Sequence, residues 1–223
     1  ERKKILSNVY HFCICLLTFG LCTSKALVSL SAATMFILAL TSFNWVEFKS
    51  EIKKNRSFFF FLLFFIFYCL STLWSSNLTA AVRDIVSKLT LVSIPLTLII
   101  KPIDSKWLKR LYTIFVWSII GTTIYNFIHY QFFTTSIKDI RALSFFISHI
   151  RFSLFISFTL GLLVKSTRTS IHGWQRFLYV SSICWLLFYM YYSEVLSGIL
   201  ALTGGVLLCI LVGLLNTTKL KKW

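Results

Sequence analysis

The sequence has little charge, and in particular few acidic residues. Only 13% of its 223 residues are charged, and seven acidic residues stand against 23 lysines and arginines. Soluble domains usually carry about 25% charged residues. No polar stretch in this chain is longer than a short loop. The composition therefore excludes a sizeable soluble domain.

The sequence also lacks the motifs of self-contained soluble active sites. It has no His-Glu-x-x-His motif, no Ser-His-Asp arrangement, no phosphate-cradling glycine-rich loop and no paired-carboxylate motif. Its six cysteines lie in or at the edges of apolar blocks, and none forms a metal-type pair with a second pair nearby. We expect such cysteines to pack as small apolar side chains and to form no disulfides. We expect neither a metal site nor a cofactor.

What the sequence does have is long apolar blocks, and 57% of its residues are hydrophobic. Apolar residues in blocks, rather than at helical or strand period, are typical of a polytopic membrane protein, whose spanning helices need about 20 residues each. The sequence therefore predicts an all-α, polytopic transmembrane helical bundle that forms a single transmembrane domain over residues 1–223. About eight spans are expected, at 5–22, 26–43, 58–74, 85–100, 111–133, 150–164, 177–192 and 195–215. Pro95 should bend the fourth span.

The basic residues indicate how the spans are oriented. Cytoplasmic loops of membrane proteins carry an excess of lysine and arginine. With the N-terminus placed in the cytoplasm, 17 of the 23 basic residues fall on that side. The pattern predicts a chain with both ends inside, and it explains the net charge of +16 without a nucleic-acid partner. The six basic residues on the outer side are Lys25, Arg83, Lys88, Lys138, Arg141 and Arg151.

Five of these outer basic residues lie in two loops, and the first loop covers residues 74–91. Asn77 is placed to cap a helix, and Asp84 and Lys88 have the spacing of an ion pair along it. The segment predicts an amphipathic helix along the membrane interface that leads into the fourth span. Arg83 has two interpretations there, a phosphate contact or a side chain that extends to the membrane surface.

The second loop, residues 134–151, contains Lys138, Asp139, Arg141, His149 and Arg151. His149 and Arg151 stand directly before the sixth apolar run, in ISHIRFSLFISF. Arginine presents a planar fork that suits phosphate and stays charged when partly desolvated. One interpretation is therefore a site for a lipid-linked phosphate or pyrophosphate. The other is an anchoring arginine beside a structural histidine.

The last two spans carry two further features. Glu194, in a tight turn with Ser193, is the acidic residue on the outer side of this helical pair, and it is either a partner of an outer arginine or a water-facing turn residue. Small residues recur at every fourth position of the last span and predict close packing of another helix. These residues are Ser197, Ala201, Gly205, Cys209 and Gly213. His11 and His129, within spans, are expected to have hydrogen-bonded structural roles.

Three segments resemble O-antigen ligase/polymerase-type membrane proteins. The segment CLSTLWSSNLTAAVRDIVSKLTLVSIPLTLI is similar to a Leu-x-x-Leu-Trp-Ser motif that precedes a helix and a proline-containing span. ISHIRFSLFISF resembles the His-x-Arg-Phe-Ser variant of members from Bacteroidetes-like bacteria. YYSEVLSGILALTGGVLLCILVGLL is similar to a later Ser-x-x-x-x-Gly span. The resemblance covers residues 58 to 215.

The resemblance implies a glycosyltransferase of the bacterial inner membrane that needs no nucleotide sugar. Such proteins move a glycan from a polyprenyl-pyrophosphate carrier at the periplasmic face. The acceptor is lipid A-core in O-antigen ligases and another carrier-linked repeat in polymerases. By position, the resemblance makes Arg83, Arg141 and Arg151 the candidate pyrophosphate contacts, with His149 beside them.

The chain also departs from the family's pattern. Family members usually have ten or more spans and a long periplasmic loop with a histidine after the region matched here, so we expect this chain to be the N-terminal part of an enzyme or an inactive copy. Where many relatives have Ser-Arg, this chain has Ser193-Glu194. Two alternatives stay open, a transporter of lipid-linked glycan and a non-catalytic membrane scaffold. A transporter is disfavoured because the sequence shows no repeat and only two prolines.

Overall fold

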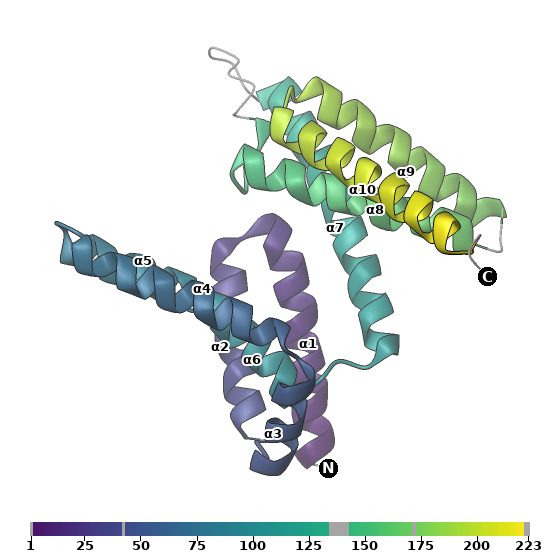
Figure 1. Ribbon diagram of the computed structural model, residues 1–223. Helices are drawn as coiled ribbons and strands as arrows, with labels where there is room; N and C mark the ends of the chain where they lie inside the picture. Colours follow the sequence, from purple (N-terminus) through teal and green to yellow (C-terminus); the bar gives the residue numbers. More distant parts are fainter. Residues whose placement is uncertain (1, 42, 134–142, 171–172, 221–223) are drawn as a thin grey trace. The chain divides into compact units, whose positions relative to one another are not determined.

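The computed structural model describes residues 2–41, 43–133, 143–170 and 173–220. In these ranges the regular elements are helices, and none is a strand, as the sequence predicts (Figure 1). The chain divides into two compact units, Glu1–Leu111 and Tyr112–Trp223, and each unit is described by itself. The prediction of a single transmembrane domain concerns how the two units associate, and it stays a prediction.

The first unit is built around a pair of helices that are joined at Ser24. Gly20 permits their close approach, because a Cβ atom at this position would lie 3.0 Å from the Leu27 Cβ and 3.2 Å from the Val28 nitrogen. The elements of this unit are α1 (Arg2–Thr23), α2 (Lys25–Leu40), α3 (Trp45–Lys54), α4 (Ser57–Ser71), the 3₁₀ helix η1 (Thr72–Trp74), α5 (Leu78–Lys88), α6 (Thr90–Ile100) and the first turns of α7 (Ser105–Phe133).

Helix α6 packs against α2, α3 and α4. A small core forms at the lower end of α1, where Tyr10, Ile14 and Met35 are buried together. The Tyr10 hydroxyl donates a hydrogen bond to the carbonyl of Lys101 over 2.7 Å, and the Lys101 ammonium lies 4.4 Å from the centre of the Tyr10 ring. Partial burial in this position lowers the pKa of Lys101. These contacts fix the connection between α6 and α7 against α1.

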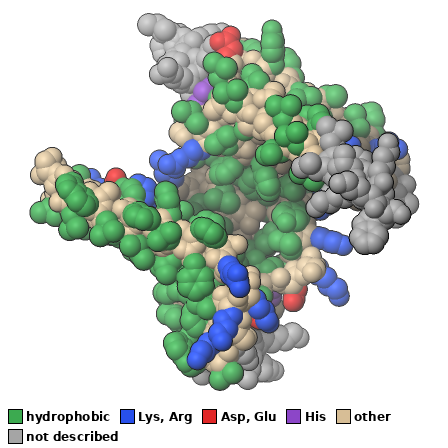
Figure 2. Space-filling view, viewed as in Figure 1, with side chains coloured by type: hydrophobic (Ala, Val, Ile, Leu, Met, Phe, Trp, Pro, Cys, Tyr) green, Lys and Arg blue, Asp and Glu red, His purple; other side chains and the backbone are tan. Residues whose placement is uncertain are grey.

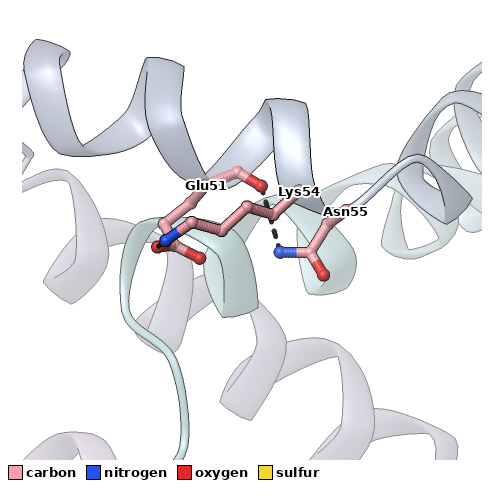
Figure 3. Close-up of polar contacts among 3 residues, drawn as sticks. All are labelled: Glu51, Lys54 and Asn55. Carbon is pink, nitrogen blue, oxygen red and sulfur yellow. Dashed lines mark hydrogen bonds and ion pairs between the residues drawn. The ribbon is translucent and has the colours of Figure 1, made fainter.

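Helix α3 is a short amphipathic helix in the basic loop that follows α2. Its first turn is capped by Asn44, whose side-chain oxygen accepts a hydrogen bond from the Val46 nitrogen over 3.1 Å. At its other end, Lys54 pairs with Glu51 over 2.6 Å, and the Asn55 amide donates to the Glu51 carbonyl over 3.1 Å (Figure 3). Side-chain bonds at both ends therefore define the helix.

Helices α4 and α5 form an arm that extends away from the α1–α2 pair (Figure 1). The phenylalanine-rich α4 is almost entirely uncovered, and Phe60 and Phe67 expose 74% and 63% of their surface. Hydrophobic side chains cover the arm in Figure 2. An apolar surface of this extent is stable only against lipid or other apolar partners.

The second unit consists of the rest of α7 with α8 (His149–Thr169), α9 (Gly173–Tyr192) and α10 (Leu196–Leu220). Helix α8 packs between α9 and α10, and the three run side by side (Figure 1). Phe115 of α7 meets Phe155 of α8 edge to face at 5.8 Å. The Trp185 indole of α9 donates to the Thr123 hydroxyl of α7 over 2.9 Å. These two contacts hold α7 against α8 and α9.

Five described helices are long and apolar enough to cross a membrane, and the chain is a multi-pass membrane protein. The five segments are Ile5–Thr23, Ser57–Trp74, Ser105–Phe132, His149–Thr169 and Leu196–Gly213. The second predicted span is the 16-residue apolar helix α2, and the seventh is α9, which falls outside these five. The total of eight spans and the orientation stay predictions.

The fourth predicted span, residues 85–100, differs from expectation. It is divided at Leu89 between α5 and α6, and Pro95 lies inside the 11-residue α6. The division falls where an amphipathic helix gives way to an apolar one, so the change of environment, and not the proline, marks the break.

Candidate functional site

The site predicted at the start of α8 centres on His149, and its imidazole is held at both nitrogens. Nε2 lies 3.1 Å from the backbone carbonyl of Ser193, and Nδ1 lies 3.0 Å from the hydroxyl of Ser144. Because a carbonyl can only accept, Nε2 carries a proton and donates it to Ser193. In the neutral ring Nδ1 then accepts from Ser144. His149 thus ties the loop before α8 to the turn between α9 and α10.

Behind His149 the polar contacts continue into the interior of the second unit. The Ser144 hydroxyl and the Asn126 amide both lie beside the Tyr189 phenol, which is 1% exposed. The Tyr189 hydroxyl also points to the carbonyl of Leu143 at 3.4 Å. These residues bring together α7, the loop before α8, and α9.

Asn126 is the unusual member of this group. It is 1% exposed, and among the described residues its Oδ1 is the buried side-chain oxygen with no hydrogen-bond partner. Most other buried polar side chains of the unit are hydroxyls that donate to a carbonyl in their own helix, as Thr122 does to Ser118. An unsatisfied amide oxygen is costly away from water. The group therefore has spare capacity to accept a hydrogen bond.

Arg151 is the third residue of α8, in the first turn of the helix, and its side chain is exposed. Its guanidinium forms no hydrogen bond, ion pair or ring contact with the part of the chain that the structure describes. A helix N-terminus carries partial positive charge, so the first turn of α8 and Arg151 favour an anion at the same place. His149 and Arg151 both lie in the first turn of α8, and of the two only His149 is held by described neighbours. Their shared role in a phosphate site stays a prediction.

After His149 along α8, Ser153 and Ser157 contact α10, and these contacts form a serine seam between the two helices. The Ser153 and Ser197 hydroxyls lie 3.1 Å apart, and the Ser157 hydroxyl donates to the carbonyl of Gly198 over 2.8 Å. A Cβ at Gly198 would lie 2.7 Å from the Cβ of Ser153, so the two backbones approach as only glycine permits. This seam fixes α10 against the half of α8 that carries His149.

Glu194 lies in the tight turn that the sequence predicts between α9 and α10. Its backbone has a φ of 52°, in the left-handed region, where residues other than glycine are strained. The side chain is exposed and forms no ion pair with the described residues. Because Arg141 lies outside the described residues, the choice between a partner of an outer arginine and a water-facing turn residue stays open.

Arg83 belongs to the first unit, on α5, and it is exposed. The predicted cap is confirmed, because the Asn77 side chain accepts from the Ala80 nitrogen over 3.1 Å. The predicted ion pair between Asp84 and Lys88 is wrong. Both side chains turn instead to one aromatic ring of the neighbouring helix α4.

That ring is Tyr68. Its hydroxyl donates to Asp84 over 3.0 Å, and the Lys88 ammonium lies 3.7 Å from the ring centre. The phenol hydroxyl donates a hydrogen bond to a carboxylate, and the face of the ring attracts a cation. Contacts of Asp84 and Lys88 with Tyr68 therefore replace a direct ion pair between them. The contacts dock α5 onto α4, and Arg83 takes no part in them.

The other predicted residues are placed as follows. Arg141, with Lys138 and Asp139, lies outside the described residues. Because Arg83 and Arg151 lie in different units, no distance between them is defined. His11 has the expected structural role, since its Nδ1 lies 2.7 Å from the carbonyl of Ser7 and its ring stacks on Trp107.

The sequence analysis did not identify Ser144, Asn126 or Tyr189 as members of the site. One signal was present in the sequence, because Ser153 and Ser157 follow His149 at four-residue spacing and so share one face of α8. A similar signal was present on α7, because Ser118, Thr122 and Asn126 recur at four-residue spacing. Neither spacing shows that these residues meet Tyr189 and His149, which lie far along the chain. No family model matches the chain, and no curated protein or solved structure matches it.

Proposed function

We propose that this membrane protein binds a polyprenyl-pyrophosphate-linked glycan at the N-terminal end of α8. In this proposal the protein is a glycosyltransferase of the O-antigen ligase or polymerase type, and it acts at the periplasmic face of a bacterial inner membrane. The acceptor would be lipid A-core for a ligase. The proposal rests on the sequence resemblance, and on the contacts that surround α8.

The observation that carries the proposal is that Arg151 is exposed and has no partner among the described residues. It is exposed at the end of a helix of spanning length, and no described residue neutralises it. In this proposal Arg151 lies at the level of the lipid headgroups, and a guanidinium binds phosphate oxygens in a bidentate manner. Arg151 is thus the group in the described part of this site that is ready to receive a pyrophosphate.

His149 has a different part in the proposal. Because both ring nitrogens have partners, the ring acts as a positioning residue that sets the first turn of α8 against the α9–α10 turn.

A binding measurement tests the proposal. The purified chain in detergent is titrated with a polyprenyl-pyrophosphate glycan, and wild type is compared with Arg151→Ala and with Arg176→Ala. Arg176 is an exposed arginine at the start of α9, at the opposite end of the α8–α9 hairpin, and serves as the control for charge. A lost charge-assisted contact should weaken binding by about tenfold or more at Arg151. Equal affinity for wild type and both variants would contradict the proposed site.

A non-catalytic subunit is the second candidate. It is favoured by the engagement of both His149 nitrogens, because a general base needs a free nitrogen within reach of the acceptor hydroxyl. The same preparation distinguishes the two. Glycan transfer to an acceptor supports the enzyme, whereas binding that depends on Arg151 without transfer supports the subunit.

A further inference from the structure

A groove runs between α8 and α10, beyond the serine seam and toward the end of α8 that is opposite to His149. Its volume is about 860 Å³. The two helices approach closely at Ser153 and Gly198, and the residues that line the groove follow this contact on both helices. It lies wholly within the second unit. Its lining includes Leu154, Phe158, Leu162, Val164, Leu202 and Val206.

Part of the groove lining consists of residues with a small side chain or none, which leave its volume unfilled. Gly161 of α8 and Gly205 of α10 both line it, and a Cβ added at either would meet nothing within 4 Å. Ala201 and Cys209 lie one turn on either side of Gly205 on the same face. Three of the five small residues predicted to pack against a helix therefore border a space that the described residues do not fill, whereas Ser197 packs against α8.

Among the described residues that line the groove one is charged, and it lies near the C-terminal end of α8. Arg168 is in the last turn of α8, exposed, and forms no hydrogen bond or ion pair with the described residues. From Leu154 to Arg168 helix α8 rises by about 21 Å. One leaflet of a bilayer contributes about 15 Å of hydrocarbon. The groove is thus long enough for an acyl chain whose phosphate lies at Arg168.

We propose that this groove binds an anionic glycerophospholipid. One acyl chain lies along Gly161 and Gly205, and the phosphate pairs with the Arg168 guanidinium. The charge decides between occupants, because an apolar helix would fill the groove but would leave Arg168 without an anion, whereas a lipid brings both parts. The site is at the opposite end of α8 from Arg151 and is independent of the function proposed above.

Native mass spectrometry of the full chain in detergent tests the proposal. The probes are phosphatidylglycerol, zwitterionic phosphatidylcholine with the same chains, and glycerol 3-phosphate, which has the headgroup charge without chains. Phosphatidylglycerol should bind most tightly, and glycerol 3-phosphate should not bind. Arg168→Gln should weaken phosphatidylglycerol about fivefold and leave phosphatidylcholine unchanged. Arg176→Gln, which removes the same charge from α9, should have no effect.

A second pair of variants tests the apolar part. Gly205→Leu places a side chain in the groove and should reduce binding of both lipids, whereas Gly204→Leu should not. Gly204 is the matched control, because its Cβ would also meet nothing within 4 Å but it does not line the groove. Equal effects of the two leucines, or of the two glutamines, would overturn the proposal.

Crosslinking of the unmodified chain covers the case in which a variant fails to fold. Phosphatidylglycerol with a photoactivatable group in its acyl chain should label the residues that line the groove, and labelling elsewhere alone would overturn the proposal. If Cys209 instead crosslinks two copies of the chain, and added phosphatidylglycerol does not compete, the groove holds a helix and the lipid proposal fails.

Discussion

The contact between α8 and α10 gives the sharpest test of how the second unit is held together. In Gly198→Ala, the new Cβ would lie 2.7 Å from the Cβ of Ser153, 3.2 Å from its carbonyl oxygen and 3.2 Å from the Met190 sulfur. Two carbon atoms pack best at about 3.5–4.0 Å, so α10 has to move away by about 1 Å. Backbone and Cβ atoms cannot rotate aside, so the strain is not relieved locally.

The cost follows from the packing and from the hydrogen bonds that the movement stretches. Overpacking in a tight interior typically costs about 1–3 kcal/mol. Two polar contacts cross the same seam, between Ser153 and Ser197 and from Ser157 to the Gly198 carbonyl. Hydrogen bonds between membrane helices contribute about 0.6 kcal/mol each. We expect Gly198→Ala to lower the free energy of unfolding by about 2–3 kcal/mol.

The assay is reversible unfolding in mixed micelles, followed by circular dichroism. Gly204→Ala is the control, because its Cβ meets nothing within 4 Å. The double variant with Ser153→Gly should recover part of the loss, since it removes the Cβ that the alanine strikes. If Gly198→Ala and Gly204→Ala unfold at the same denaturant concentration, the close approach of α8 and α10 is refuted.

Three further variants test single contacts by the same unfolding assay. Glu194→Gly should stabilise the chain by about 0.5–1 kcal/mol, because glycine adopts a positive φ without strain. The greater conformational entropy that glycine loses on folding offsets only part of this gain, and a loss of stability would contradict the turn conformation. His149→Ala should cost about 1–2 kcal/mol, because it leaves the Ser193 carbonyl without its donor, and an unchanged midpoint would contradict this role. Tyr68→Phe should cost about 0.5–1 kcal/mol through the bond to Asp84, whereas Tyr68→Leu, which also removes the ring, should cost more.

Much of the fold could be predicted because membrane helices are specified by composition. Apolar blocks identify helical segments without knowledge of their neighbours, since backbone groups in lipid have to bond within the helix. The cap at Asn77 and the turn at Ser193 and Glu194 are equally local, and both were predicted. Local signals of this kind depend on a few adjacent residues.

What the sequence did not show depends on contacts between distant segments. The stripe that includes Gly205 predicted the helix contact, but the close approach is at Gly198, one position outside the stripe, because the rotation of α10 is set by the seam with α8. The acceptor for His149 is a backbone carbonyl 44 residues away, which no side-chain pattern marks. Likewise, Tyr68 separates Asp84 from Lys88 because it comes from another helix.

The most direct test of the whole account is the sidedness of the two ends of α8. In a chain without its native cysteines, single cysteines at Ser148 and at Thr169 are labelled with a membrane-impermeant maleimide in right-side-out and inside-out vesicles. The account predicts that Ser148→Cys reacts from the outside and Thr169→Cys from the inside. Reaction of both from the same side would contradict a spanning α8, and with it the separate phosphate positions at Arg151 and Arg168.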